Sequence, residues 1–222
     1  MSYYLAIDIG ASSGRHILGS IEDGKIKLEE IYRFENGISK IGDEYCWDIQ
    51  GLFNEIKKGI KKCKEIGKVP KTIGIDTWAV DFVLLDENDE MLGNAVAYRD
   101  DRTEGYMEKA FQVIPQDMLY LYTGIQFQRF NTLYQLLAIK DKNSEYLKKA
   151  KTFLMIPDYL NFLLTGKKAN EYTNATSTQL VNSFDRTWDK NILKEYGINE
   201  EMFQEIKMPK TSLGKLRKEL VD

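Results

Sequence analysis

The chain has 222 residues, of which 43% are hydrophobic and 29% charged, and its net charge at pH 7 is -3. This length accommodates one large domain or two small ones around a sizeable core. The slightly negative charge excludes a general electrostatic attraction to nucleic acid or to acidic membranes, so we expect a small-molecule ligand and neither of those partners.

Its cysteines and histidine exclude several kinds of site. Cys46 and Cys63 form no CxxC pair, so we expect reduced thiols in a cytoplasmic protein and no zinc site. His16 is the single histidine, and nothing near it supports a Ser-His-Asp triad. The first residues lack a basic region followed by an apolar stretch, so they do not resemble a signal peptide.

The first hundred residues read as strands interrupted by one helix. Apolar runs predict strands at 3–9, 15–21, 25–34, 72–77 and 79–86. Asp48 is the expected N-cap of a helix over 49–66, in which apolar residues recur at helical spacing. Three strands, a helix and further strands is the order of the ribonuclease-H-like unit. We therefore predict an α/β fold with a mixed sheet flanked by helices, as in sugar kinases, actin and Hsp70-type ATPases.

From Arg102 onward the pattern is helical. Repeats of apolar residues at i, i+3 and i+4 predict helices near 103–113, 131–142, 144–150, 155–164 and 189–206. We interpret this part as a helical insertion that shares one core with the strands. The segment from Gly214 to Asp222 has no closing feature, so we expect the chain to be a fragment.

The first candidate site is the turn after the first strand. Small residues let the backbone approach an anion, and hydroxyl and guanidinium groups donate hydrogen bonds to phosphate oxygens. Asp8 ends the strand, where its carboxylate is placed to hold Mg²⁺. The pattern is neither a Walker A loop nor G-x-G-x-x-G. A tight polar hairpin without a ligand is the alternative. The predicted phosphate-binding residues are Gly10, Ala11, Ser12, Ser13, Gly14 and Arg15.

A second candidate site lies where the strand at 72–77 ends. Asp76 and Asp81 offer carboxylates to sugar hydroxyls, and Trp78 offers an aromatic face to the apolar side of a sugar. The alternative is a polar turn with Trp78 in the core.

Two later segments add candidates for the same ligand. Arg99 is placed to form charge-assisted hydrogen bonds, and Gln126 and Phe130 precede a helix whose expected N-cap is Asn131 or Thr132. We favour a structural role, as part of an Arg–Asp network at a helix start, for the neighbouring residues Asp101, Arg102 and Thr103.

Six motifs together resemble the rhamnulokinases of the FGGY family of carbohydrate kinases. They occur in the family's order, and the resemblance covers about residues 4 to 190. The resemblance implies transfer of the γ-phosphoryl group of ATP, with Mg²⁺, to the 1-hydroxyl of L-rhamnulose. It also implies that Ala11 to Arg15 contact the nucleotide, that Asp8 supports the metal, and that Trp78 and Ala79 contact the sugar. The motifs span 8–15, 75–86, 98–100, 130–136, 155–159 and 171–176.

The chain departs from this family pattern in two ways. Ala79 stands where the family usually has glycine, and we expect the added methyl group to tighten or narrow the sugar pocket, which leaves the exact ketose open. The family's catalytic aspartate, in a His-Asp-Thr motif, and its adenine-binding half would follow the matched region, so we expect no catalytic base within 1–222. We therefore predict that 1–222 is the N-terminal, sugar-binding domain of an FGGY kinase, inactive alone.

Three alternatives remain open. The chain is part of another FGGY kinase acting on xylulose, fuculose or glycerol, a non-catalytic sugar-binding or regulatory domain, or an actin- or Hsp70-like ATPase. The sugar-type loops disfavour the last. The sequence leaves the oligomeric state open.

Overall fold

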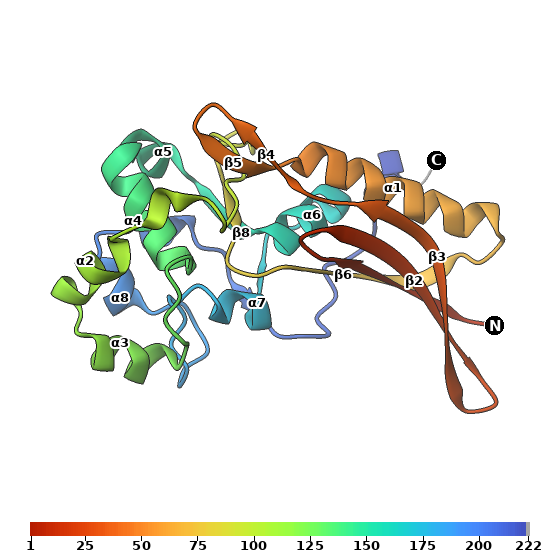
Figure 1. The fold of residues 1–222 in the computed structure, drawn as a ribbon. Helices are drawn as coiled ribbons and strands as arrows, with labels where there is room; N and C mark the ends of the chain where they lie inside the picture. The colour runs from red at the N-terminus through yellow and green to blue at the C-terminus, as the bar shows by residue number, and fades with distance from the viewer. Residues whose placement is uncertain (221–222) are drawn as a thin grey trace.

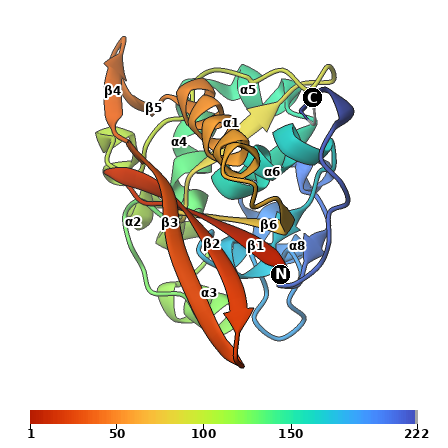
Figure 2. The ribbon, with the colours of Figure 1, turned by 90° about the vertical axis from the view of Figure 1, so that its right-hand side faces the viewer.

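The computed structural model describes residues 1–220, and its first half is built on a four-stranded mixed sheet (Figure 1). In the sheet order β3-β2-β1-β6, β1 pairs antiparallel with β2 and parallel with β6. This arrangement confirms the mixed sheet expected from the sequence. The hairpin of β2 and β3 extends beyond the other strands (Figure 2). The strands are β1 (Tyr3–Ile9), β2 (Ser13–Glu22), β3 (Lys25–Glu35) and β6 (Pro70–Thr77).

One long helix, α1 (Ile49–Glu65), packs against this sheet. As predicted, Asp48 caps it, and its side chain accepts a hydrogen bond from the backbone N–H of Gly51 at 2.8 Å. Leu52, Phe53, Ile56 and Cys63 of its apolar side are buried in the core. His16 of β2 meets the helix at Gly59, where a Cβ atom would lie 2.3 Å from the imidazole ring.

The second half is mainly helical, as expected, but its boundaries differ from the predicted ones. The predicted helix over 189–206 ends at Glu195, because the chain turns at Gly197 with a φ of +59°. A helix at 116–123 was not predicted; it lies between Pro115 and Gly124, which has a φ of +65°. The helices are α2 (Tyr106–Val113), α3 (Gln116–Thr123), α4 (Thr132–Lys142), α5 (Ser144–Lys149), α6 (Ile156–Thr165), α7 (Tyr172–Thr176) and α8 (Lys190–Glu195).

A two-stranded ribbon of β7 (Phe82–Leu85) and β8 (Thr152–Met155) stands between two hydrophobic cores. Val83 and Leu85 belong to the core of the sheet and α1, whereas Phe82 and Leu84 belong to the core of the helical part. The expectation of one shared core is therefore wrong: there are two cores that share this ribbon. The predicted strand over 79–86 begins only at Phe82.

The remaining elements are short. They are β4 (Ile38–Ile41), β5 (Glu44–Trp47), β9 (Asn170–Glu171), β10 (Ile206–Lys207) and the 3₁₀ turns Asp101–Thr103, Glu200–Met202 and Lys218–Leu220. Within residues 1–220, no helix is both long and apolar enough to cross a membrane.

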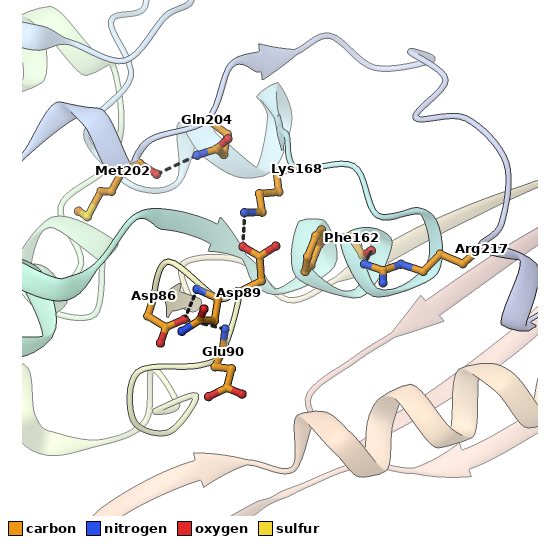
Figure 3. Close-up of polar contacts among 9 residues, drawn as sticks. Asp86, Asp89, Glu90, Phe162, Lys168, Met202, Gln204 and Arg217 are labelled. Carbon is orange, nitrogen blue, oxygen red and sulfur yellow. Dashed lines mark hydrogen bonds and ion pairs between the residues drawn. The ribbon is translucent and has the colours of Figure 1, made fainter.

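The last described segment lies against α6. Arg217 donates a hydrogen bond to the carbonyl oxygen of Phe162 at 3.3 Å, and its guanidinium group lies 5.2 Å from the centre of that ring (Figure 3). After α6, Lys168 forms an ion pair with Asp89, next to the turn in which Asp86 accepts backbone hydrogen bonds. These contacts tie Arg217 to α6, and Lys168 to the turn that follows β7.

We predict that His16 makes the stability of the fold depend on pH. Burial lowers its pKa from 6.5 to about 4. The unfolded chain therefore binds a proton that the folded chain does not, and folding stability falls as the pH drops from about 6.5 toward 4, by roughly 3 kcal/mol in full. Urea unfolding at several pH values should show a steeper loss in the wild type than in His16→Leu. Parallel pH profiles, or an imidazole that titrates near pH 6.5 by NMR, would contradict this.

Candidate functional site

Both predicted loops begin at the same edge of the sheet. In the parallel pair of β1 and β6, Asp8 lies opposite Asp76, and Ile9 lies opposite Thr77. Because the two strands run in the same direction and end in register, the chain leaves both of them at one edge. Adjacent strands are about 4.8 Å apart, so the carboxylate of Asp8 neighbours that of Asp76.

The turn after β1 is held by hydrogen bonds within itself and by Asn36. The N–H of Gly10 donates to the carbonyl of Ser13 at 2.8 Å. Asn36, which follows β3, donates its backbone N–H to Ser12 at 3.0 Å and its side-chain amide to the carbonyl of Gly10 at 2.8 Å. The turn is thus prefolded, with Ser12 exposed. The sequence analysis assigned no role to Asn36 in this turn.

The two glycines of the turn have different roles. Gly14 is buried in β2, and a Cβ atom there would lie 2.1 Å from the ring of Phe34. At Gly10 the same atom would make an ordinary contact of 3.5 Å with the carbonyl of Ser13. Packing of the Phe34 ring therefore requires glycine at position 14, whereas Gly10 is exposed beside the predicted phosphate site.

Arg15 and Asp8, predicted to meet phosphate and metal respectively, form an ion pair with each other. The guanidinium Nε and Nη2 lie 2.9 and 2.8 Å from one carboxylate oxygen of Asp8. Both side chains are about half exposed, so a surface ion pair of this kind is weak and open to exchange. Burial, and next the negative charge of Asp8, raise the pKa of Asp76.

These two carboxylates fit a Mg²⁺ ion that arrives with a nucleotide. Among residues 1–220 there is no group of three or more His, Cys, Asp or Glu side chains arranged to hold a metal by themselves. Mg²⁺ is ordinarily bound by one or two carboxylates together with phosphate oxygens and water. Asp8, just before the turn at 10–15, and Asp76, near the end of β6, meet that requirement.

Asp81 is placed differently from the expectation that it binds sugar. It is only 1% exposed. One carboxylate oxygen accepts hydrogen bonds from the indole N–H groups of Trp47 and Trp78 and the backbone N–H of Tyr98, and the other accepts from the amide of Gln135. Burial raises its pKa to about 6, although these four donors oppose the rise. Its oxygens are therefore committed to the protein interior.

Four aromatic rings line this corner, and we call them the aromatic wall: Trp47, Trp78, Tyr98 and Phe130. The rings of Trp47 and Trp78 pack with centroids 3.9 Å apart and planes inclined by 32°, and those of Tyr98 and Phe130 meet edge to face at 5.4 Å. The guanidinium group of Arg99 lies 5.5 Å from the centre of the Tyr98 ring. The wall brings the predicted Trp78, Arg99 and Phe130 together. Trp47 was not predicted from the sequence to belong here, and Tyr98 was included only as part of the motif at 98–100.

A polar cavity of about 210 Å³ opens beside the wall, lined by Asp76, Thr77 and Ala79 at the end of β6. Its opposite side is formed by α6 and the turn into α7, including Asp158 and Glu171. Asp158 is buried, and its carboxylate accepts a hydrogen bond from the backbone N–H of Glu171 at 3.1 Å. Burial raises the pKa of Asp158 well above the ordinary value. The sequence gave these side chains no role of their own.

Gln126 is exposed in the segment that leads to Phe130, and its carbonyl accepts a hydrogen bond from Asn131 at 3.0 Å. Asn131 does occupy the N-cap position of α4, but its side chain makes no capping hydrogen bond there. Arg102 is largely buried and donates to Gln135 at 2.6 Å, in agreement with the structural role favoured for it.

Residues 3–222 match the N-terminal domain of the FGGY family of carbohydrate kinases. The chain belongs to this family. It is 60% identical over 222 residues to a rhamnulokinase from Halalkalibacterium halodurans, covering all of this chain and 47% of that protein. Identity to a rhamnulokinase from Bacillus subtilis is 44% over 216 residues, or 97% of this chain and 44% of that one. The chain thus spans about half the length of these relatives.

Solved structures of FGGY kinases share the fold. A xylulose kinase from Lactobacillus acidophilus superimposes with a TM-score of 0.89 at 22% identity, over 100% of this chain and 45% of that chain. A glycerol kinase from Plasmodium falciparum superimposes with a TM-score of 0.79 at 22% identity, over 100% of this chain and 46% of that one. These matches confirm the fold class predicted from the order of strands and helices.

A strained backbone residue lies directly before Asp81, at the corner lined by the aromatic wall. Val80 has a φ of +66°, which a β-branched residue adopts only under constraint. Its N–H donates to the hydroxyl of Ser177 at 3.2 Å, and its carbonyl accepts from the hydroxyl of Thr132 at 2.6 Å. Such strain persists where the surroundings over-determine the backbone, and it gathers at ligand sites.

We predict that Asp8→Asn in the full-length kinase lowers kcat at least about tenfold while sugar KM changes little. The amide keeps the size of the side chain but loses the charge that attracts Mg²⁺, so the loss falls on phosphoryl transfer rather than on sugar binding. Steady-state kinetics at saturating Mg²⁺ measure both parameters. Asp43→Asn, an exposed carboxylate in the turn between β4 and β5, is the control and should match the wild type. Equal losses in kcat and sugar affinity would count against a metal role.

Proposed function

We propose that this chain is the sugar-binding, N-terminal domain of a cytoplasmic kinase that transfers the γ-phosphoryl group of ATP to the 1-hydroxyl of L-rhamnulose. The observation that carries this proposal is the 60% identity to a rhamnulokinase along the entire chain. The shared sheet edge of Asp8 and Asp76 supports it, because a kinase needs its phosphate and sugar sites side by side.

In this proposal the turn from Gly10 to Arg15 binds the nucleotide phosphates. Ser12 and Ser13 donate hydroxyl hydrogen bonds, and Arg15 moves from Asp8 to a phosphate oxygen. Asp8 and Asp76 would hold Mg²⁺, which would neutralise charge on the phosphates. Once Arg15 has turned to a phosphate oxygen, the carboxylate of Asp8 would be available to that ion.

The sugar binds against the aromatic wall and the mouth of the polar cavity. Trp78 covers the apolar C–H side of the ketose, while Arg99 and Gln126 donate hydrogen bonds to its hydroxyls. Asp76 accepts from a hydroxyl directed toward the phosphate turn. The proton of the 1-hydroxyl passes to an aspartate in the C-terminal half that the relatives carry. That half also binds adenine. Closure of the two halves excludes water, so that ATP is not lost to hydrolysis.

We predict that the 222-residue chain alone does not turn over ATP, because the proposal places the catalytic base outside it. A coupled assay of ADP release with L-rhamnulose should stay at background for this chain and give robust turnover for the full-length protein. A panel of L-fuculose, xylulose and glycerol with the full-length protein identifies the substrate, and L-rhamnulose should have the highest kcat/KM. Turnover by the chain alone would refute the placement of the base. A higher kcat/KM for another sugar would refute the assigned substrate.

A further prediction concerns Ala79, which lines the polar cavity. Ala79→Gly removes a methyl group beside the proposed sugar and widens the cavity there. One methyl group contributes a factor of about ten or more to discrimination in a packed pocket. We expect the ratio of kcat/KM for L-rhamnulose over bulkier ketoses to fall while ATP KM stays the same. Unchanged ratios across the panel would mean that Ala79 does not contact the sugar.

A further inference from the structure

Asp81 lies at the centre of the sugar corner without facing it. Trp47 donates its indole N–H to one Asp81 oxygen at 2.7 Å, and Trp78 donates to the same oxygen at 2.9 Å. Tyr98 adds its backbone N–H to that oxygen at 3.0 Å, and Gln135 donates to the second oxygen at 3.1 Å. A single buried carboxylate thus accepts from three of the four members of the aromatic wall.

These bonds define the orientation of the two indole rings. Packing of the rings at 3.9 Å between centroids, with their planes inclined by 32°, sets the separation of Trp47 and Trp78, but it leaves each ring free to slide or rotate against the other. Because both indole N–H groups point to one oxygen, that freedom is removed. Trp47 is only 4% exposed, whereas Trp78 is half-buried. Trp47 therefore backs the wall, and Trp78 presents a face to a ligand.

The charge of Asp81 is balanced from the side away from the wall. Gln135 donates to Asp81 and accepts from the buried guanidinium of Arg102 at 2.6 Å, so it links the two opposite charges. The positive charge of Arg102 is surrounded by Asp81, Glu44 and Asp100. A buried carboxylate without such a counter-charge would be costly.

The side-chain amide of Gln135 also fixes the backbone of the corner. Gln135 donates to the carbonyl of Phe130 at 2.9 Å and to that of the strained Val80 at 3.3 Å. Asp81, Gln135 and Arg102 consequently hold both the rings and the loop backbone in one arrangement before any ligand arrives.

We propose that Asp81 is a positioning residue for sugar binding: it does not touch the ketose, but fixes the Trp47–Trp78 pair in the orientation that accepts the apolar face of the sugar. This inference rests on the proposed function only for the identity of the ligand. The orientation of the indoles is a property of the unliganded protein and can be tested separately.

The test is Asp81→Asn in the full-length protein. In either orientation of the new amide, one of its N–H groups faces a donor, either an indole N–H or the amide of Gln135, whose oxygen is already bonded to Arg102. An unsatisfied buried donor disfavours the present orientation of the indole rings, and so weakens sugar binding, about ten- to one-hundredfold. We expect L-rhamnulose KM to rise in that range, with kcat and ATP KM changed by less than about threefold. The tryptophan emission of the unliganded protein should shift.

Two further variants separate positioning from general destabilisation. Trp78→Phe keeps a ring but loses the N–H, so Asp81→Asn added to it should raise KM much less than in the wild-type background. Asp189→Asn alters another buried carboxylate that accepts backbone N–H bonds, at the start of α8, and should leave sugar KM unchanged. If Asp81→Asn does not fold, Trp47→Phe carries the test, because it removes one indole hydrogen bond to Asp81 from a ring that is 4% exposed and does not face the ligand. Sugar KM should rise in Trp47→Phe, and an unchanged sugar KM would overturn the inference.

The inference is overturned by an unchanged sugar KM and emission spectrum in Asp81→Asn, by equal rises in sugar and ATP KM, or by additive effects in the double variant. Failure of the proposed function looks different. In that case the wild-type protein does not phosphorylate L-rhamnulose, while the shift in tryptophan emission on Asp81→Asn is still observed.

Discussion

The parallel pairing of β1 with β6 is the constraint on which the rest of the site depends. Its register sets Asp8 opposite Asp76, so the turn proposed to bind phosphate and the corner proposed to bind sugar start from neighbouring strand ends. A shift of the register by one residue would turn one of the two carboxylates to the opposite face of the sheet. That face is packed against α1, where Leu5, Ile7 and Ile9 of β1 are buried, and burial of these side chains therefore fixes the register.

The two loops are built on different principles. The turn proposed to bind phosphate is short, exposed and held mainly by backbone hydrogen bonds and Asn36, which suits a ligand that makes its own contacts with N–H and hydroxyl groups. The corner proposed to bind sugar is organised around a buried charge. Asp81 accepts hydrogen bonds there from two indole N–H groups, one backbone N–H and one side-chain amide. Preorganisation of this kind reduces the entropy lost on binding a flexible polyol. Strain at Val80 is the local cost of holding the corner in that form.

Sequence reasoning was most reliable where the pattern is local. The strands at either side of the phosphate turn and the Asp48 cap of α1 follow from periodicity and capping chemistry. It failed where a few apolar residues are compatible with helix and strand alike: β8 has only four residues, and only its pairing with β7 identifies it as a strand. The division into two cores depends on that pairing and was missed for the same reason.

The candidate site shows a similar division. Residue type indicated that Asp76, Trp78 and Arg99 belong near a ligand, and the fold groups them at one corner. Asp81 has the same residue type as Asp76, so nothing local distinguishes a ligand-facing carboxylate from a buried one. The difference arises from Trp47 and Gln135, which lie 34 and 54 residues away along the chain. Long-range partners of this kind are determined by tertiary packing and not by the sequence pattern.

The most direct test of this account is a crystal structure of the full-length protein with a non-hydrolysable ATP analogue, Mg²⁺ and L-rhamnulose. We predict that the phosphates lie within hydrogen-bonding distance of the turn from Gly10 to Arg15. The ketose should lie against Trp78 with its 1-hydroxyl directed toward the γ-phosphate, and Asp81 should keep both indole hydrogen bonds without touching the sugar. A sugar bound away from the aromatic wall, or phosphates on the far side of the sheet from Asp8, would contradict the account.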